Sequence, residues 1–151
     1  MATSRSMTEF ARRMDIVASK FFKATTEGVK KAAVAADQEA VMRTPVATGR
    51  CRANWIVSTR GPSSRSGVKP TQAGAKGSEQ RGEANARKTI EHGRRVIEGW
   101  KGEGSIFITN NVEYAPDLDR GTSAQAPDGM TEHAIRAAER VIRRHRTLKG
   151  L

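Results

Sequence analysis

The sequence predicts a single α+β domain over residues 1–151, with a long N-terminal helix, a small antiparallel sheet, a second helix and a basic C-terminal helix. Three observations support this prediction. Apolar residues recur at helical spacing before Pro45. Two short β-rich segments flank a second helical pattern, and a last helical stripe follows Pro127. A chain of 151 residues is long enough to bury one modest core.

The first helix is expected over residues 7–43, after a frayed segment at residues 1–5. Ser6 and Glu9 fit a capping box, in which each side chain satisfies an amide of the other residue. Pro45 ends the helix, because the residue before a proline is disfavoured in the α region. The apolar stripe of this helix begins with Phe10, Met14, Val17 and Phe21.

The second half of this helix continues the stripe with smaller side chains. Such residues allow another helix to approach closely, although alanine is also common simply because it favours helix. A bend is expected near Thr25, Thr26 and Gly28. The small residues of the stripe are Ala24, Gly28, Ala32 and Ala35.

Three different segments follow the first helix. Residues 44–50 predict a compact turn, in which Gly49 is free to take a positive φ. Residues 51–59 alternate loosely and predict a half-buried strand anchored by Trp55. Residues 61–82 are rich in Gly, Ser, Pro and Lys, which predicts a mobile basic loop. This loop is either a solvated linker or an arm that orders on a partner.

The second half of the chain predicts a helix, a strand and a last helix. Apolar positions from Ala86 to Trp100 recur at helical spacing, and Gly93 within them marks either a break or a close contact. A strand over residues 94–98 is the alternative. Residues 105–109 predict the clearest strand. Asp128 is expected to cap the last helix.

No set of residues predicts catalysis, a cofactor or a metal, so we expect no enzyme. The three histidines stand singly, and Cys51 is expected to be a small buried side chain. Asp117 and Asp119 flank Leu118 and are weak evidence for acid–base chemistry or Mg²⁺. They more naturally form a negative patch that orients a basic neighbouring copy.

The net charge of +11 leaves nucleic acid, an acidic protein or solubility as explanations. No zinc finger, helix-turn-helix or aromatic platform is visible, so any DNA contact should be with the backbone. No apolar run approaches the roughly 20 residues of a membrane span, and we expect no membrane partner. The expected contacts with DNA or an acidic partner are Arg136, Arg140, Arg143, Arg144 and Arg146.

Three phrases of the sequence stand out together. The first is Thr44 to Arg50 followed by Arg52 to Trp55, TPVATGR and RANW. The second is IFITNNVEYAP over residues 106–116, and the third is GTSAQAPDGM over residues 121–130. In this order and spacing, they resemble the neck or tail-completion proteins of long-tailed bacteriophages. The sequence departs from the family pattern at Ala47, where an acid is frequent, and at Asp119-Arg120, where the pattern is closer to Glu-Tyr.

The resemblance implies a structural virion protein, assembled in the host cytoplasm, that joins the tail tube end to the head connector. It implies a homo-oligomeric ring, for which we expect six copies. The neighbours would be the tail tube or tail-terminator protein, the head connector or stopper protein, and passing genomic DNA. A tail-terminator role or a non-specific DNA-binding module are the alternatives. The candidate interface residues are Arg50, Trp55, Tyr114, Pro116, Asp117, Asp119 and Gly121.

Overall fold

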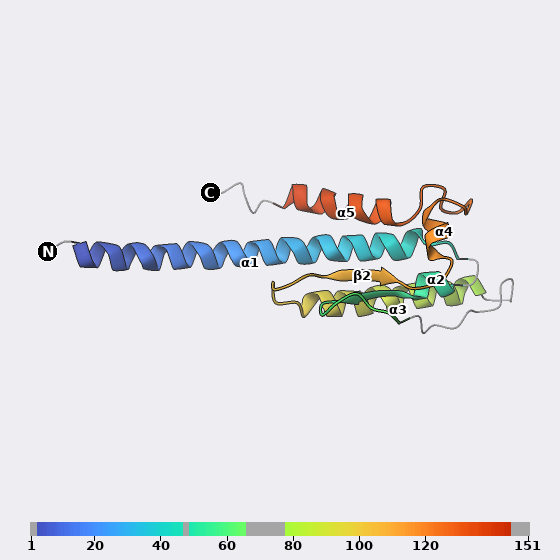
Figure 1. Cartoon of the computed structure of the whole chain (residues 1–151), viewed down its shortest axis with the longest axis horizontal. Helices are drawn as coiled ribbons and strands as arrows, with labels where there is room; N and C mark the ends of the chain where they lie inside the picture. Colours follow the sequence, from blue (N-terminus) through green and yellow to red (C-terminus); the bar gives the residue numbers. More distant parts are fainter. Residues whose placement is uncertain (1–2, 47–48, 66–77, 146–151) are drawn as a thin grey trace.

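The computed structural model describes residues 3–46, 49–65 and 78–145. It confirms the α+β class: a long N-terminal helix and a two-stranded antiparallel sheet are accompanied by further helices (Figure 1). The elements are α1 (Thr3–Arg43), α2 (Arg50–Ala53), β1 (Trp55–Ser58), α3 (Ser78–Glu98), β2 (Phe107–Asn110), α4 (Ala115–Asp119) and α5 (Thr131–Arg144).

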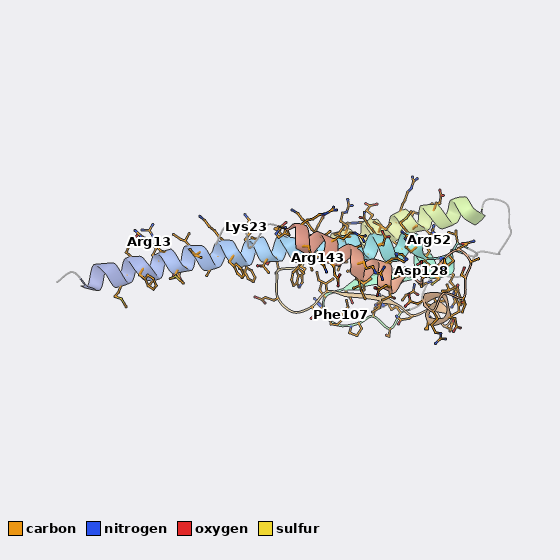
Figure 2. The ribbon with its side chains drawn as sticks, turned by 90° about the horizontal axis from the view of Figure 1, so that it is seen from above. Arg13, Lys23, Arg52, Phe107, Asp128 and Arg143 are labelled. Atoms are coloured by element: carbon orange, nitrogen blue, oxygen red, sulfur yellow. The ribbon has the colours of Figure 1, made fainter. Side chains whose placement is uncertain are left out.

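The long helix α1 is the middle layer of the fold. Figure 1 shows α5 along one side of its C-terminal half, and the sheet with α2 and α3 along the other side. Ala32 and Ala40 are buried there, whereas every residue from Met7 to Lys23 is exposed. The N-terminal half of α1 projects beyond the other elements (Figures 1 and 2).

Two predictions about α1 are wrong. The helix begins at Thr3, so residues 3–5 are helical and Ser6 lies inside the helix, where it cannot be the N-cap. The helix is also continuous through Gly28, without the expected bend (Figure 1). The small-residue prediction is confirmed, because α5 approaches closely at its end. A Cβ on Gly28 would lie 2.6 Å from Cδ2 of His145, whose Nε2 is 2.8 Å from the carbonyl oxygen of Ala24.

The sheet is shorter than predicted. Strands β1 and β2 pair in antiparallel register, with Trp55 opposite Asn110 and Ser58 opposite Phe107. The expected strand over residues 51–59 is wrong at its start, where residues 50–53 form α2 instead. Gly49 takes the expected positive φ of 68°, and its carbonyl accepts the amide of Ala53 at 3.0 Å, which closes a helical turn.

Helix α3 begins at Ser78, so residues 78–82 of the expected loop are helical. Residues 66–77 lie outside the described residues. The alternative strand over residues 94–98 is wrong, because these residues are helical. The close contact expected at Gly93 is confirmed: a Cβ there would lie 2.4 Å from Oδ2 of Asp37 and 2.8 Å from Cγ2 of Val57. Gly93 therefore allows α3 to pack against both α1 and β1.

Candidate interaction surfaces

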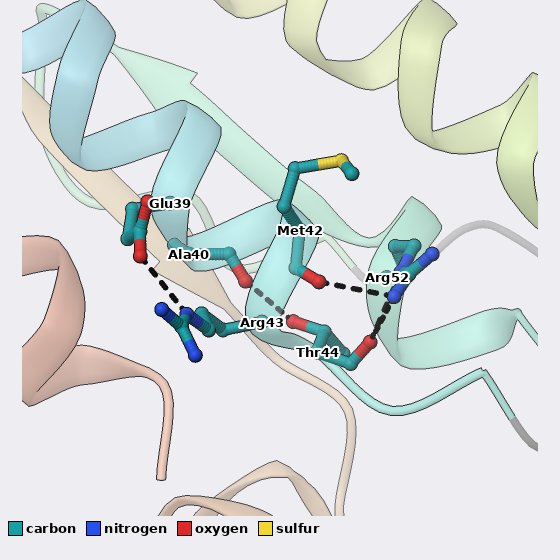
Figure 3. A network of polar contacts seen from close by, with 6 residues as sticks. All are labelled: Glu39, Ala40, Met42, Arg43, Thr44 and Arg52. Atoms are coloured by element: carbon teal, nitrogen blue, oxygen red, sulfur yellow. Dashed lines mark hydrogen bonds and ion pairs between the residues drawn. The ribbon is translucent and has the colours of Figure 1, made fainter. Parts of the chain in front are cut away.

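The first phrase of the resemblance builds the end of α1. Arg52, only 8% exposed, donates from Nε and Nη2 to the carbonyl of Thr44 at 3.0 and 2.7 Å, and from Nη2 to the carbonyl of Met42 at 3.1 Å (Figure 3). The last carbonyls of a helix have no partner within the helix. A buried guanidinium near this end also matches the helix dipole. Arg52 therefore closes the C-terminus of α1.

Thr44 and Trp55 complete this junction. The hydroxyl of Thr44 donates to the carbonyl of Ala40 at 2.6 Å and accepts Nε1 of Trp55 at 2.8 Å. Trp55 is half-buried. It thus ties the start of β1 to the end of α1, which makes it part of the fold's framework as well as a candidate interface residue.

Arg50 and Tyr114 lie around a small apolar cluster formed by Cys51, Val112 and Ala115. Arg50 pairs with the exposed Glu113 at 3.1 Å. Tyr114 is half-buried and packs against the cluster, as does Leu118. Burial raises the pKa of the Cys51 thiol to about 11, so the thiol stays neutral. The expectation that Cys51 is a small buried side chain is confirmed.

Asp119 caps α5, and the prediction that Asp128 would do so is wrong. Helix α5 begins at Thr131, and Asp128 is exposed. Oδ1 of Asp119 accepts the amides of Met130 and Thr131 at 2.8 and 2.7 Å. Burial alone would raise the pKa of Asp119, but these amide bonds outweigh it and lower the pKa. The carboxylate is therefore committed to the helix start, where negative charge is favourable.

Within the connection between β2 and α5, residues 115–119 form the short helix α4. The connection from α4 to α5 folds back on itself at two glycines. Gly121 has a φ of 81°, and a Cβ on it would lie 2.1 Å from the carbonyl oxygen of Pro127. Gly129 has a φ of 74°, and a Cβ on it would lie 2.1 Å from the carbonyl oxygen of Asp119. Both positions require glycine, which gives the connection one compact shape.

The candidate interface residues do not form one site. Trp55, Pro116 and Asp119 line a hollow of about 300 Å³ beside Met130. Asp117 is exposed at the surface of α4 and pairs with Arg120. Tyr114 packs against the Cys51 cluster and Arg50 pairs with Glu113. Gly121 shapes the connection from α4 to α5.

Trp55 also borders a second, mainly apolar hollow between α1, the sheet and α5. Its volume is about 340 Å³. Its walls include Ile108 from β2 and the exposed Ile135 and Ile142 from α5. Hollows of this size and character accept apolar side chains. No local sequence pattern indicates this surface, because only the folded chain brings Ile135 and Ile142 beside Trp55 and Ile108.

The basic residues of α5 face solvent. Arg136, Arg140, Arg143 and Arg144 are all exposed, and Arg146 lies outside the described residues. Arg136 pairs with Glu132 at 2.8 Å, and Arg143 pairs with Glu139 at 3.6 Å. Exposed pairs of this kind contribute only about 0–1 kcal/mol. They therefore leave the guanidinium groups available to an anionic partner.

Asp37 is a buried carboxyl of α1 that no sequence pattern singles out. It is 1% exposed, and its Oδ1 has no hydrogen-bond partner among the described residues. Burial raises its pKa to about 7. Its Oδ2 lies against Gly93, which Val57 also approaches, in the contact between α1, α3 and β1. It therefore lies in the core rather than on a candidate surface.

Within residues 3–46, 49–65 and 78–145, no group of three His, Cys, Asp or Glu residues could hold a metal ion. No helix among these residues is long and apolar enough to cross a membrane. Of the histidines, His92 is exposed, His133 is half-buried and His145 packs against α1. No protein-family model, curated protein or solved structure matches the chain. Function must therefore be argued from the chain's own surfaces and from the resemblance of the three phrases.

Proposed function

We propose that this chain is a structural protein of a bacteriophage neck, a tail-completion protein that joins the tail tube end to the head connector as part of a ring. The observation that carries this proposal is where the resembling phrases lie. Thr44, Arg52 and Trp55 hold the end of α1, and the third phrase, with Gly121 and Gly129, shapes the start of α5. The phrases thus define the two junctions of the fold, which supports a shared architecture.

The surfaces suit a subunit that completes its packing by assembly. The hollow of about 300 Å³ beside Trp55 is lined mainly by residues of the resembling phrases. The hollow of about 340 Å³ takes Trp55 and Ile108 from them, and its other walls come from α1 and α5. The exposed Pro116 and Asp117 stand on the short helix α4 next to the first of these hollows. A neighbour's apolar side chain would fill a hollow, and Asp117 would orient a basic neighbour by charge.

The experiment is a deletion of the gene from the phage that carries it, followed by electron microscopy of the lysate. The proposal expects filled heads and tails of normal length that remain unjoined. Complementation with the wild-type chain should restore joined virions, and an exposed substitution away from both hollows, Lys88→Ala, should do the same. Tails of abnormal length would instead support the tail-terminator alternative. Normal virions without the chain would contradict both.

A non-specific DNA-binding role is the second candidate, and the exposed arginines of α5 favour it. Within the described residues, Arg140 and Arg144 make no ion pair, so their charge is uncompensated. Each phosphate contact should steepen the dependence of log affinity on log salt by about one unit. The double substitution Arg140→Gln and Arg144→Gln should therefore lower that slope by about two. Absence of binding to duplex DNA at low salt would remove this role.

A further inference from the structure

A row of large apolar side chains lies exposed along the projecting half of α1. Its members follow one another at alternating steps of three and four residues. This is the spacing of the a and d positions of a coiled coil. The row consists of Met7, Phe10, Met14, Val17 and Phe21, which are 68%, 60%, 51%, 44% and 44% exposed. We call it the α1 row.

The α1 row continues into a seam that is already a helix–helix contact. Ala24 and Gly28 extend the same spacing by steps of three and four. At these two residues His145, which follows α5, packs directly against α1. The same face of α1 is therefore covered at Ala24 and Gly28 by the residue that ends α5. Among the described residues, nothing covers it in the N-terminal half (Figures 1 and 2).

The exposed apolar area is large enough to need a partner. The side chains of the row and their neighbour Phe22 present on the order of 600 Å² of apolar surface. Monomeric proteins rarely expose a contiguous patch larger than a few hundred Å². A standard protein–protein interface buries about 800 Å² on each partner. The α1 row therefore has nearly the area that one side of a stable interface requires.

We propose that the α1 row packs against the α1 row of a second copy of this chain, with the two helices parallel. The heptad spacing favours another helix with the same spacing, because a and d side chains then interlock along the whole seam. The helix is already formed as a continuation of the packed half of α1. Pairing therefore does not have to meet the cost of nucleating a helix.

The charges beside the α1 row select the parallel orientation. One flank carries Ala11 and Ala18, and the other carries the basic Arg13 and Lys20. In a parallel pair, each flank faces the opposite flank of the partner, so the basic residues lie opposite alanines. An antiparallel pair would bring the two basic flanks together, and like charges repel.

The proposed contact between two α1 rows is separate from the two hollows beside Trp55. It can be tested on the purified full-length protein, without a phage. The association constant is measured by sedimentation velocity over a concentration series. Met14→Glu should weaken self-association at least tenfold, because it places carboxylates opposite each other in the seam. Ile16→Glu is the matched control, since Ile16 is 47% exposed on the same stretch of helix but lies off the row. It should associate like the wild type.

The orientation is tested by a cross-link. With Met7→Cys, oxidation should join two copies at this position, because equivalent residues meet only when the helices are parallel. The native Cys51 is buried and should not take part. A wild-type protein that stays monomeric at all concentrations would overturn the proposal. Equal weakening by Met14→Glu and Ile16→Glu, or failure of the oxidised Met7→Cys protein to cross-link while it self-associates, would also overturn it. The result of the gene deletion does not affect these measurements, because they are made on the purified protein without a phage. The proposed function and the α1 contact can therefore fail separately.

Discussion

Replacing Asp37 by Asn should change how the stability of the protein depends on pH. Asp37 is 1% exposed, and its Oδ1 has no hydrogen-bond partner among the described residues. In the unfolded chain its carboxyl releases its proton near pH 4. In the folded protein, burial raises the pKa to about 7. Asn has nearly the same shape and carries no titrating group.

The direction and size of the effect follow from these two pKa values. Between pH 4 and pH 7 the unfolded chain has released a proton that the folded protein still holds, so rising pH favours unfolding. The contribution of Asp37 to the free energy of unfolding is fully present below pH 4 and is lost progressively up to pH 7. Above pH 7 it no longer changes with pH. A difference of about three pKa units corresponds to about 4 kcal/mol.

The assay is denaturant unfolding at pH 4 and pH 8, followed by circular dichroism at one fixed protein concentration. From pH 4 to pH 8, the free energy of unfolding of the wild type should fall by most of this 4 kcal/mol relative to that of Asp37→Asn. Asp15→Asn is the matched control, because Asp15 is an exposed residue of the same helix. Asp15→Asn should change the difference in unfolding free energy between pH 4 and pH 8 by much less than Asp37→Asn does. An Asp37→Asn effect of equal size at both pH values would refute the reasoning.

Three further substitutions test the junctions of the fold by unfolding measurements. Arg52→Met should lower the free energy of unfolding by about 2–3 kcal/mol, because the carbonyls of Thr44 and Met42 at the end of α1 lose their donor. Arg43 is exposed, so Arg43→Met should change this free energy by less than about 1 kcal/mol. Equal losses in the two variants would contradict the capping role of Arg52. Asp119→Ala should cost about 1 kcal/mol and Asp128→Ala nearly nothing, and the reverse order would restore Asp128 as the cap. Gly93→Ala should destabilise the protein by about 1–3 kcal/mol, because the new Cβ clashes with Asp37. The same change in a helix with free space around it would stabilise the helix by about 1 kcal/mol. A Gly93→Ala variant that is more stable than the wild type would refute the close contact.

The sequence predicted those parts of the fold that depend on local pattern. Helical spacing placed the long helix and its end before Pro45, and β-rich composition placed the second strand within two residues of β2. The close contact at Gly93 was one of two interpretations of a glycine inside a helix, the other being a break, and the structure bears out the close contact. These features are encoded within a few neighbouring residues.

The errors fall where residues distant in sequence meet. Asp119 caps a helix that begins 12 residues later, which only the folded connection from α4 to α5 makes possible. Arg52 reaches back across the turn to the carbonyl of Thr44, and this compact arrangement bends residues 50–53 into α2 instead of a strand. The burial of Asp37 depends on the approach of α3 at Gly93. No local pattern could have shown any of these three contacts.

The most direct test of the proposed function is a cryo-electron microscopy reconstruction of the neck of virions from the phage that carries this gene. We expect a ring of this fold between the head connector and the tail tube, with the α1 helices of neighbouring copies parallel about the ring axis. A neck that contains no copy of this fold in well-resolved virions would contradict the proposal.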